Sequence, residues 1–227
     1  MKTMATRFTM IVLLAGALTT LAFAYRTPST ATCPAERGYS PAMQAKIRSA
    51  EARLAQYARD EAAVNKNLQT FDTLDFVVFS GQEWVRLHES HAQDVIVNWP
   101  DGHHTNGIQK HIEDLKALFI HAPDTQIKVH PVRFGVYRGA TSSSMSLDGK
   151  QSVLPIVGGD GFTCVTGLMT GTFTKPMPIG DGKFIQPTGK SFSVPMCTVG
   201  HWQNGTMTEE WLYWDNATYV KQLGIGQ

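Results

Sequence analysis

A glutamate among aromatic residues is the first candidate for chemistry in this sequence. The segment TMTEEWLYWD reads as a strand, and alternation along it places five side chains on one face: Met207, Glu209, Trp211, Tyr213 and Asp215. If this face is buried, loss of water raises the pKa of Glu209 and suits it to general acid–base catalysis near neutral pH. The structural alternative is that Glu209 bonds a backbone group or a helix N-terminus.

Histidine is the second chemical resource, with eight in the chain. His88 and His91 are three residues apart in a predicted helix and therefore share one side of it. His103 and His104 follow a Pro-Asp-Gly sequence that ends a predicted strand, and Asp101 beside them could fix the tautomer of a histidine base. The alternative for both loop histidines is simple exposure to solvent.

The sequence predicts neither a metal ion nor a cofactor. His-x-x-His and His-His supply imidazoles, but they lack the fixed spacing of known metal sites and an acidic ligand set. The sequence contains no Gly-x-Ser-x-Gly elbow, phosphate-binding loop or dinucleotide fingerprint. Cys164 and Cys197 have no neighbouring base in the sequence that would support a covalent nucleophile. General acid–base chemistry therefore remains.

These residues must be positioned by helices that come early in the chain. Ser40 can cap a helix whose first residue is Pro41. Helical patterns are predicted over four ranges: 41–59, 61–76, 84–91 and 106–121.

Strands dominate the second half of the chain. Alternation and turn residues predict them near 94–99, 126–137, 161–174, 190–202 and 206–215. Asn204-Gly205 is a hairpin signal because both residues tolerate positive φ. Residues 139–160 read as an insertion or a long hairpin. Helices followed by antiparallel strands predict an α+β fold, in which a curved sheet packed by helices forms a cone around an apolar pocket.

The N-terminus predicts export. Lys2 and Arg7 precede an apolar run and an Ala-Phe-Ala cleavage site, so residues 1–24 read as a signal peptide. A retained membrane anchor is the alternative, but the run is short for a span of roughly 20 apolar residues. Residues 25–60 read as a flexible leader and a helical extension. We therefore expect a periplasmic or secreted protein without stable membrane insertion after cleavage.

The charge balance and the number of cysteines exclude further classes of function and fold. The chain has 20 Lys+Arg and 19 Asp+Glu; without Lys2 and Arg7 the balance is 18 to 19, with no basic run, which argues against a nucleic-acid partner. Three cysteines are too few for a disulfide scaffold. Cys164 and Cys197 fall on sequential strands, where they form either one disulfide or two buried free thiols.

Between about residue 61 and residue 227, the predicted helices and strands carry several short motifs of a known kind. They are Trp84, His88 and His91; Asn98-Trp99-Pro100-Asp101-Gly102 with Gly107 and His111; Gly167 and Gly171-Thr172-Phe173; Pro187-Thr188-Gly189-Lys190; and Glu209, Trp211, Asp215 and Gln222-Leu223-Gly224. With these residues, 61–227 resembles the SnoaL-like polyketide cyclase (ester cyclase) group of the nuclear-transport-factor-2-like superfamily.

This resemblance implies a cone-shaped α+β barrel, no organic cofactor, and acid–base chemistry in an apolar pocket. Cyclases of the group close a ring by intramolecular aldol addition, with an aspartate assisted by a histidine, and group members often form homodimers through the open sheet face. In this sequence Thr198 stands at the aspartate position and Met169 at the histidine position. Neither side chain exchanges protons near neutral pH, so an acid–base pair must come from other residues.

The predicted function follows from these residues. The chain is expected to be an exported, cofactor-independent cyclase, isomerase or lyase that acts on a small hydrophobic carbonyl compound, with Glu209, His104 or His88, and Asp101 as catalytic groups. The expected pocket lining suits a flat, hydrophobic molecule: Trp99, Met169, Phe173, Met196, Thr198, Trp202, Trp211 and Tyr213. The alternative is a non-catalytic small-molecule-binding protein, whose pocket would be lined only by methionine, threonine and aromatic residues.

Overall fold

The computed structural model describes residues 38–136, 141–145, 151–155 and 161–225. Contacts divide the chain into two units, residues 1–47 and residues 48–227. The predicted signal peptide, Cys33 and most of the predicted leader lie outside the described residues, and the predicted boundary at residue 60 stays a prediction.

One long helix replaces the first two predicted helices. Helix α1 (Pro41–Thr73) begins where expected, and the Ser40 hydroxyl accepts a hydrogen bond from the Met43 amide at 3.3 Å. The buried residues of α1 begin at Asp60. A π-helix, η2 (Leu74–Phe79), follows directly. Its wider turn is visible in a bond from the Ser80 amide to the Asp75 carbonyl, five residues back.

The other helices are short. They are the 3₁₀-helix η3 (Trp84–Glu89), α2 (Ile108–His121) and α3 (Asn216–Leu223). The C-terminal motif of the resemblance has structural functions: the Asp215 carboxylate caps α3, and Gly224 ends it with a φ of 73°. The Gln222 side chain bonds both backbone groups of Ser193.

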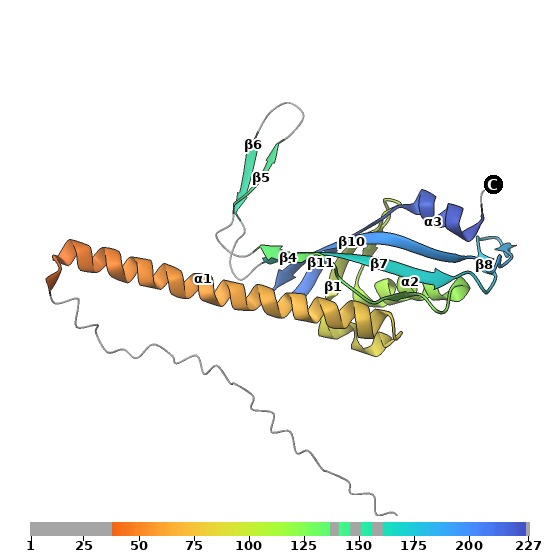
Figure 1. Ribbon diagram of the computed structural model, residues 1–227, viewed down its shortest axis with the longest axis horizontal. Coiled ribbons are helices and arrows are strands. Elements are labelled where there is room, and N and C mark those ends of the chain that lie inside the picture. The colour runs from red at the N-terminus through yellow and green to blue at the C-terminus, as the bar shows by residue number, and fades with distance from the viewer. Residues whose placement is uncertain (1–37, 137–140, 146–150, 156–160, 226–227) are drawn as a thin grey trace, which may run out of the picture. The chain divides into compact units, whose positions relative to one another are not determined.

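The main sheet has the strand order β2-β1-β11-β10-β7-β3, with β4 also paired to β7 (Figure 1). Its strands are β1 (His91–Asn98), β2 (His104–Asn106), β3 (Gln126–Ile127), β4 (Arg133–Val136), β7 (Gly161–Thr172), β10 (Ser191–Gln203) and β11 (Thr206–Trp214). Pairing is antiparallel except between β1 and β11, which are parallel. The predicted α+β class and curved sheet are confirmed, but the sheet is not closed into a barrel within the described residues.

Two smaller hairpins lie outside the main sheet. Strands β5 (Thr141–Met145) and β6 (Gln151–Pro155) pair inside the segment predicted as an insertion or hairpin. Strands β8 (Met177–Pro178) and β9 (Phe184–Ile185) form the other pair. The strand predicted at 126–137 is divided into β3 and β4, which pair with different parts of β7.

The turn between β10 and β11 controls which side chains face inward. Asn204 and Gly205 have φ values of 52° and 82°, as the hairpin signal predicted. Beyond the turn, Met207 pairs with Trp202, but His201 pairs with Glu209, so Thr208 is an extra residue in β11. This β-bulge shifts the inward set by one position from there onward.

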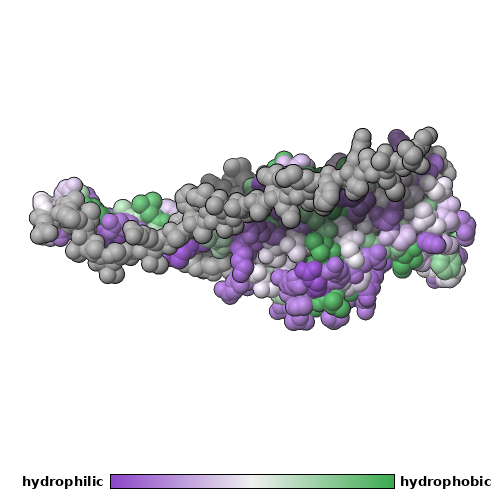
Figure 2. Space-filling model, turned by 60° about the horizontal axis from the view of Figure 1, so that its bottom comes forward, coloured by the Kyte–Doolittle hydropathy of each residue, from purple (hydrophilic) through white to green (hydrophobic). Residues whose placement is uncertain are grey.

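The hydrophobic core lies between one face of the sheet and the helices η2 and α2. Phe79 of η2 meets Phe119 of α2 with ring centroids 5.2 Å apart. Val194 and Met196 from β10, both buried, belong to the same cluster. On the face shown in Figure 2, the hydrophobic residues form separate patches among hydrophilic ones. In the described part of the chain, no helix combines the length and the hydropathy needed to cross a bilayer.

Candidate functional site

A cavity of about 40 Å³ lies between the sheet, η2 and α2. Most of its lining is apolar: Leu74, Phe79, Trp99, Leu115, Leu118, Ile127, Met169, Met196, Leu212 and Trp214. Five polar side chains also face it: Asp75, His91, His111, Thr198 and Glu210. Four of these five are titratable, which is unusual for an apolar lining and points to a functional site.

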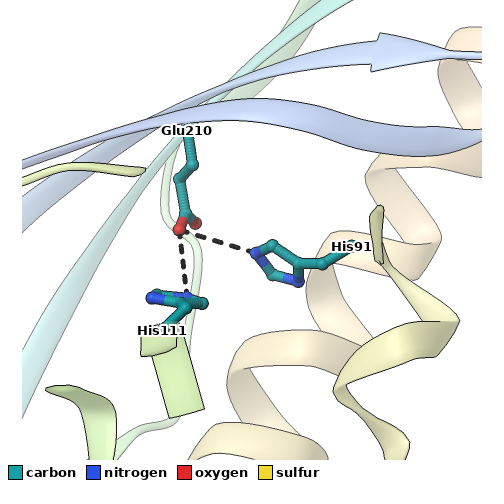
Figure 3. Close-up of side chains that lie close together, drawn as sticks. All are labelled: His91, His111 and Glu210. Atoms are coloured by element: carbon teal, nitrogen blue, oxygen red, sulfur yellow. Dashed lines mark ion pairs between the residues drawn. The ribbon is translucent and has the colours of Figure 1, made fainter. Parts of the chain in front are cut away.

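Glu210 and two histidines form one cluster, which we call the Glu210 cluster. Glu210 is on β11, His91 is at the start of β1, and His111 is on α2 (Figure 3). Glu210 Oε2 lies 3.6 Å from His91 Nε2 and 3.5 Å from His111 Nε2. All three residues are at most 4% exposed. The cluster therefore has almost no access to bulk solvent.

The electrostatics of the cluster keep Glu210 charged. Burial opposes its ionisation, but the neighbouring imidazole of His91, and to a lesser extent that of His111, lowers the pKa of Glu210 below its ordinary value. Burial lowers the pKa of His111 to about 4, so that this imidazole is neutral near pH 7. The other ring nitrogen of His91, Nδ1, lies 2.8 Å from Ser90 Oγ, which fixes the orientation of the ring.

A second pair, Asp75 with His130, borders the same cavity, and we call it the Asp75 pair. Asp75 Oδ2 bonds His130 Nε2 at 2.7 Å, and His130 Nδ1 bonds Asp72 Oδ1 at 2.8 Å. Burial raises the pKa of Asp75, although the bond and charge of His130 act in the opposite direction. Burial also opposes the charge on His130, but the bonds and charges of Asp75 and Asp72 raise its pKa overall. Both ring nitrogens of His130 face carboxylates, so His130 donates through each of them and Asp75 accepts at the edge of the cavity.

Local features of the backbone bring these groups together. The Thr208 bulge turns Glu210 inward, and the wide turn of η2 carries Asp75 to the cavity edge. Gly107, at a φ of 87° that favours glycine, starts α2 so that His111 lies on its buried face.

Half of the predicted pocket lining is found at the cavity. Trp99, Met169, Met196 and Thr198 line it as predicted. Phe173 and Trp202 are fully buried, but they belong to the core and do not line the cavity. The expectation for Trp211 and Tyr213 is wrong: the bulge places them on the outer face, where Tyr213 is 53% exposed.

The residues predicted to be catalytic lie outside the cavity. Glu209 Oε1 accepts a bond from Asn98 Nδ2 at 3.2 Å, and Asn98 Oδ1 lies 2.8 Å from His104 Nδ1, so Glu209 and His104 meet through Asn98. His88 is exposed, with its Nδ1 2.7 Å from the Val85 carbonyl oxygen. Asp101 does contact a loop histidine, His103 at 2.6 Å, but both side chains are exposed. The inward placement of Glu209 is wrong because strict alternation fails at Thr208.

Five residues of the site escaped assignment from sequence, and Glu210 is one of them because the Thr208 bulge carries no mark in the sequence. His111 carried a usable signal, because it shares the apolar face of its helix with Ile108 and Leu115. His91 is the first residue of β1, which begins before the predicted strand at 94–99, and it lies on the same face as the buried Val95 and Val97. Asp75 sits in a π-helix, and His130 lies in an irregular segment between β3 and β4. Sequence periodicity predicts neither position.

No protein-family model and no curated protein matches this sequence. Solved structures do match its fold. A candidate SnoaL-like polyketide cyclase from Jannaschia sp. CCS1 is similar with a TM-score of 0.50 and 16% identity over 72% of this chain and 95% of that one. This chain has the SnoaL-like fold. A candidate polyketide cyclase from Streptomyces antibioticus has a TM-score of 0.47 and 17% identity, over 70% of this chain and 99% of its own. The resemblance inferred from sequence is thus confirmed at the level of the fold.

Proposed function

We propose that this chain is an exported enzyme that moves protons on a small hydrophobic carbonyl compound held in the cavity, a reaction of cyclase, isomerase or lyase type. One observation carries the proposal: two separate titratable groups, the Glu210 cluster and the Asp75 pair, face a single apolar cavity. The binding-protein alternative expects a cavity lined only by methionine, threonine and aromatic residues. Export is inferred from the sequence pattern of residues 1–24.

Asp75 is the group that takes the proton from carbon and returns it. Burial raises its pKa, while the pKa of Glu210 is lowered, so two carboxylates at one cavity are suited to different tasks. His130 fixes the direction of the Asp75 carboxylate through the 2.7 Å bond. Asp72, whose side chain is 28% exposed, connects His130 to solvent and to the Arg133 guanidinium.

The opposite wall of the cavity binds the carbonyl oxygen. Thr198 Oγ1 is buried and has no hydrogen-bond partner among the described residues, so its hydroxyl is free to donate to a substrate. Thr198 stands where the resemblance places the aspartate of the cyclases. The position thus changes from a proton acceptor to a hydrogen-bond donor, and the proton-transfer task passes to Asp75. The Glu210 cluster completes the polar wall.

The cavity must enlarge to admit such a substrate. Its volume of about 40 Å³ is enough for a few water molecules, whereas pockets for drug-sized ligands measure roughly 300–1,000 Å³. Met169 and Met196 both line it, and methionine is the apolar side chain that most easily changes rotamer. We therefore assign the entry of the substrate to displacement of these two side chains.

The test follows hydrogen–deuterium exchange at the carbon next to the carbonyl of 2-tetralone, a flat hydrophobic ketone, by proton NMR in D₂O. The full chain should accelerate the exchange, and Asp75→Asn should lower the acceleration by about 10²–10⁴-fold. Asparagine has the same shape and still accepts a bond from His130. Asp94→Asn, at an exposed position of β1, is the matched control and should keep the acceleration.

Two results would contradict the proposal. If the wild type and Asp75→Asn accelerate the exchange equally, Asp75 is not the base. If the folded wild-type protein accelerates exchange neither in 2-tetralone nor in the smaller ketone cyclopentanone, the proposed function is wrong.

A further inference from the structure

The donor atoms of the Glu210 cluster have the spacing of ligands on one metal ion. His91 Nε2, His111 Nε2 and a Glu210 carboxylate oxygen lie within 4.8 Å of one another. The two distances to Glu210 Oε2, 3.5 and 3.6 Å, are long for good hydrogen bonds. Ligands bound at about 2.0–2.1 Å to a tetrahedral zinc ion lie roughly 3.3 Å apart. The two carboxylate–imidazole distances are within a few tenths of an ångström of this spacing, and the three donor atoms, which all lie within 4.8 Å of one another, would have to draw together around one ion.

Hydrogen bonding around His91 fixes which nitrogen carries the proton. The Ser90 hydroxyl donates its only hydrogen to the Leu87 carbonyl at 3.1 Å, so Ser90 Oγ accepts from His91 Nδ1. In the neutral imidazole, Nε2 then presents a lone pair toward the Glu210 carboxylate. Two lone pairs that face each other in a buried site repel, unless a cation lies between them or His91 is itself protonated. A ligating histidine usually donates its other ring N–H to a neighbouring acceptor, and Ser90 Oγ is such an acceptor for His91.

Two buried polar atoms of the cluster that lack hydrogen-bond partners give an independent argument for a cation. His91 Nε2 and Glu210 Oε2 are fully buried and have no hydrogen-bond partner among the described residues. A buried carboxylate is costly without a nearby cation. His91 and Glu210 would therefore both gain a partner from a cation at this point.

We propose that His91, His111 and Glu210 bind one divalent cation of the zinc type, through Nε2, Nε2 and Oε2. Two imidazoles and one carboxylate are a ligand set of catalytic zinc and of non-haem iron sites, which leave coordination positions open. All three residues line the cavity, as Thr198 does, so a coordination position left open would face that cavity. A cation there would bind and polarise the carbonyl oxygen while Asp75 moves the proton. The sequence predicted no metal because its histidine patterns contain only one of these ligands.

The experiment measures metal binding without any assay of activity. The full chain is treated with a chelator, dialysed, and titrated with Co²⁺, whose visible absorption reports on its ligands; Zn²⁺ then competes. We expect about one equivalent of Co²⁺ in the wild type. His91→Ala, His111→Ala and Glu210→Gln should each weaken binding by more than about 100-fold, since loss of outer supporting groups alone costs about 10–100-fold.

Two control variants separate this site from surface binding. Glu209→Gln changes the neighbouring carboxylate on the outer face, and His104→Ala removes an exposed histidine; both should keep the Co²⁺ spectrum. If the controls lose Co²⁺ and the cluster variants keep it, the assignment is overturned. A folded, chelator-treated wild type without a Co²⁺ spectrum overturns it too, whatever the variants do. In that case the cluster is an imidazolium–carboxylate pair, and the proposed function can still stand, because its test depends on Asp75.

Discussion

Glu209 and Glu210 are adjacent in the chain but face opposite sides of the sheet. Glu210 is 4% exposed and points into the cavity with two histidines, whereas Glu209 bonds Asn98 outside it. Successive strand residues face opposite sides, and the bulge, in which Thr208 and Glu209 lie opposite His201, decides that Glu210 is the one facing inward. One extra residue thus decides which of two identical side chains belongs to the site.

Deletion of Thr208 tests this account of the bulge. Without it, Met207, Glu209 and Glu210 would alternate in, out and in, so Glu210 would still face the cavity. We expect the deletion variant to fold and to bind Co²⁺ like the wild type. An added serine after Glu209 should turn Glu210 outward and abolish binding. A folded deletion variant that loses Co²⁺ would show that the bulge itself, through its local twist, positions the carboxylate.

Removal of His130 should destabilise the fold strongly. Its side chain is 1% exposed and lies between Asp72 and Asp75, with the rings of Phe71 and Phe76 against it and Arg133 bound to Asp72. His130→Ala leaves a buried carboxylate without its partner, which costs about 3–5 kcal/mol. Urea unfolding measures this loss. His88→Ala, at an exposed histidine, is the control and should change the free energy of unfolding little.

The same histidine makes stability depend on pH. The folded-state pKa of His130 is raised above 6.5, so its contribution is fully present below pH 6.5 and is lost as pH rises through the raised pKa. Asp72, Asp75 and Arg133 are the charged groups around it. The difference in unfolding free energy between wild type and His130→Gln should therefore shrink as pH rises from 6 to 9. A difference that grows over this range would contradict the assignment of charge to His130.

Met196→Ala should lower the stability of the fold and make the cavity easier for a substrate to enter. Loss of a buried methionine side chain costs about 2–5 kcal/mol and leaves space. Met207→Ala is a matched control, because Met207 is also buried but does not line the cavity. Both variants should lower the melting temperature, but only Met196→Ala should lower the KM for 2-tetralone exchange. Equal effects on KM would indicate that the substrate binds elsewhere.

Cys164 should react slowly with alkylating agents. Cys164 and Cys197 are free thiols with their sulfur atoms 3.5 Å apart on β7 and β10. Burial, and then the bond to Cys197, raise the pKa of Cys164 from 9.0 to about 11. At pH 8 the thiolate fraction, and so the rate with iodoacetamide, should be about 100-fold below that of a simple thiol. Peptide mass spectrometry over a time course measures it; a normal rate would contradict the shift.

Strand alternation predicted β10 well and β11 poorly, for a physical reason. Phe192, Val194, Met196 and Thr198 are all buried, because β10 is regular as far as the turn. Strand β11 has the same alternating pattern in the sequence, but its bulge leaves no clear mark there. Because the fold depends on many periodic positions in many elements, one irregular strand does not prevent its prediction.

The site depends on single positions and so was only partly predictable. Asp75 in its π-helix and His130 in an irregular segment interrupt periodicity at the points where the chemistry lies. The four predicted lining residues that lie at the cavity, Trp99, Met169, Met196 and Thr198, all belong to strands or follow one directly. Strands thus position much of the cavity wall, and irregular segments position Asp75, His130 and Glu210, whereas His111 comes from the regular helix α2.

The parallel pairing of β1 with β11 affects how this protein is made. Asn98 bonds the carbonyl of Glu210, a residue 112 positions later in the chain. A ribosome that has finished β1 and α2 has produced both histidines of the Glu210 cluster, but the carboxylate is still to be synthesised. Such long-range pairing also forms slowly. The cluster is therefore among the last parts of the molecule to assemble, and a cation destined for it would be taken up after synthesis, in whichever compartment the chain completes its folding.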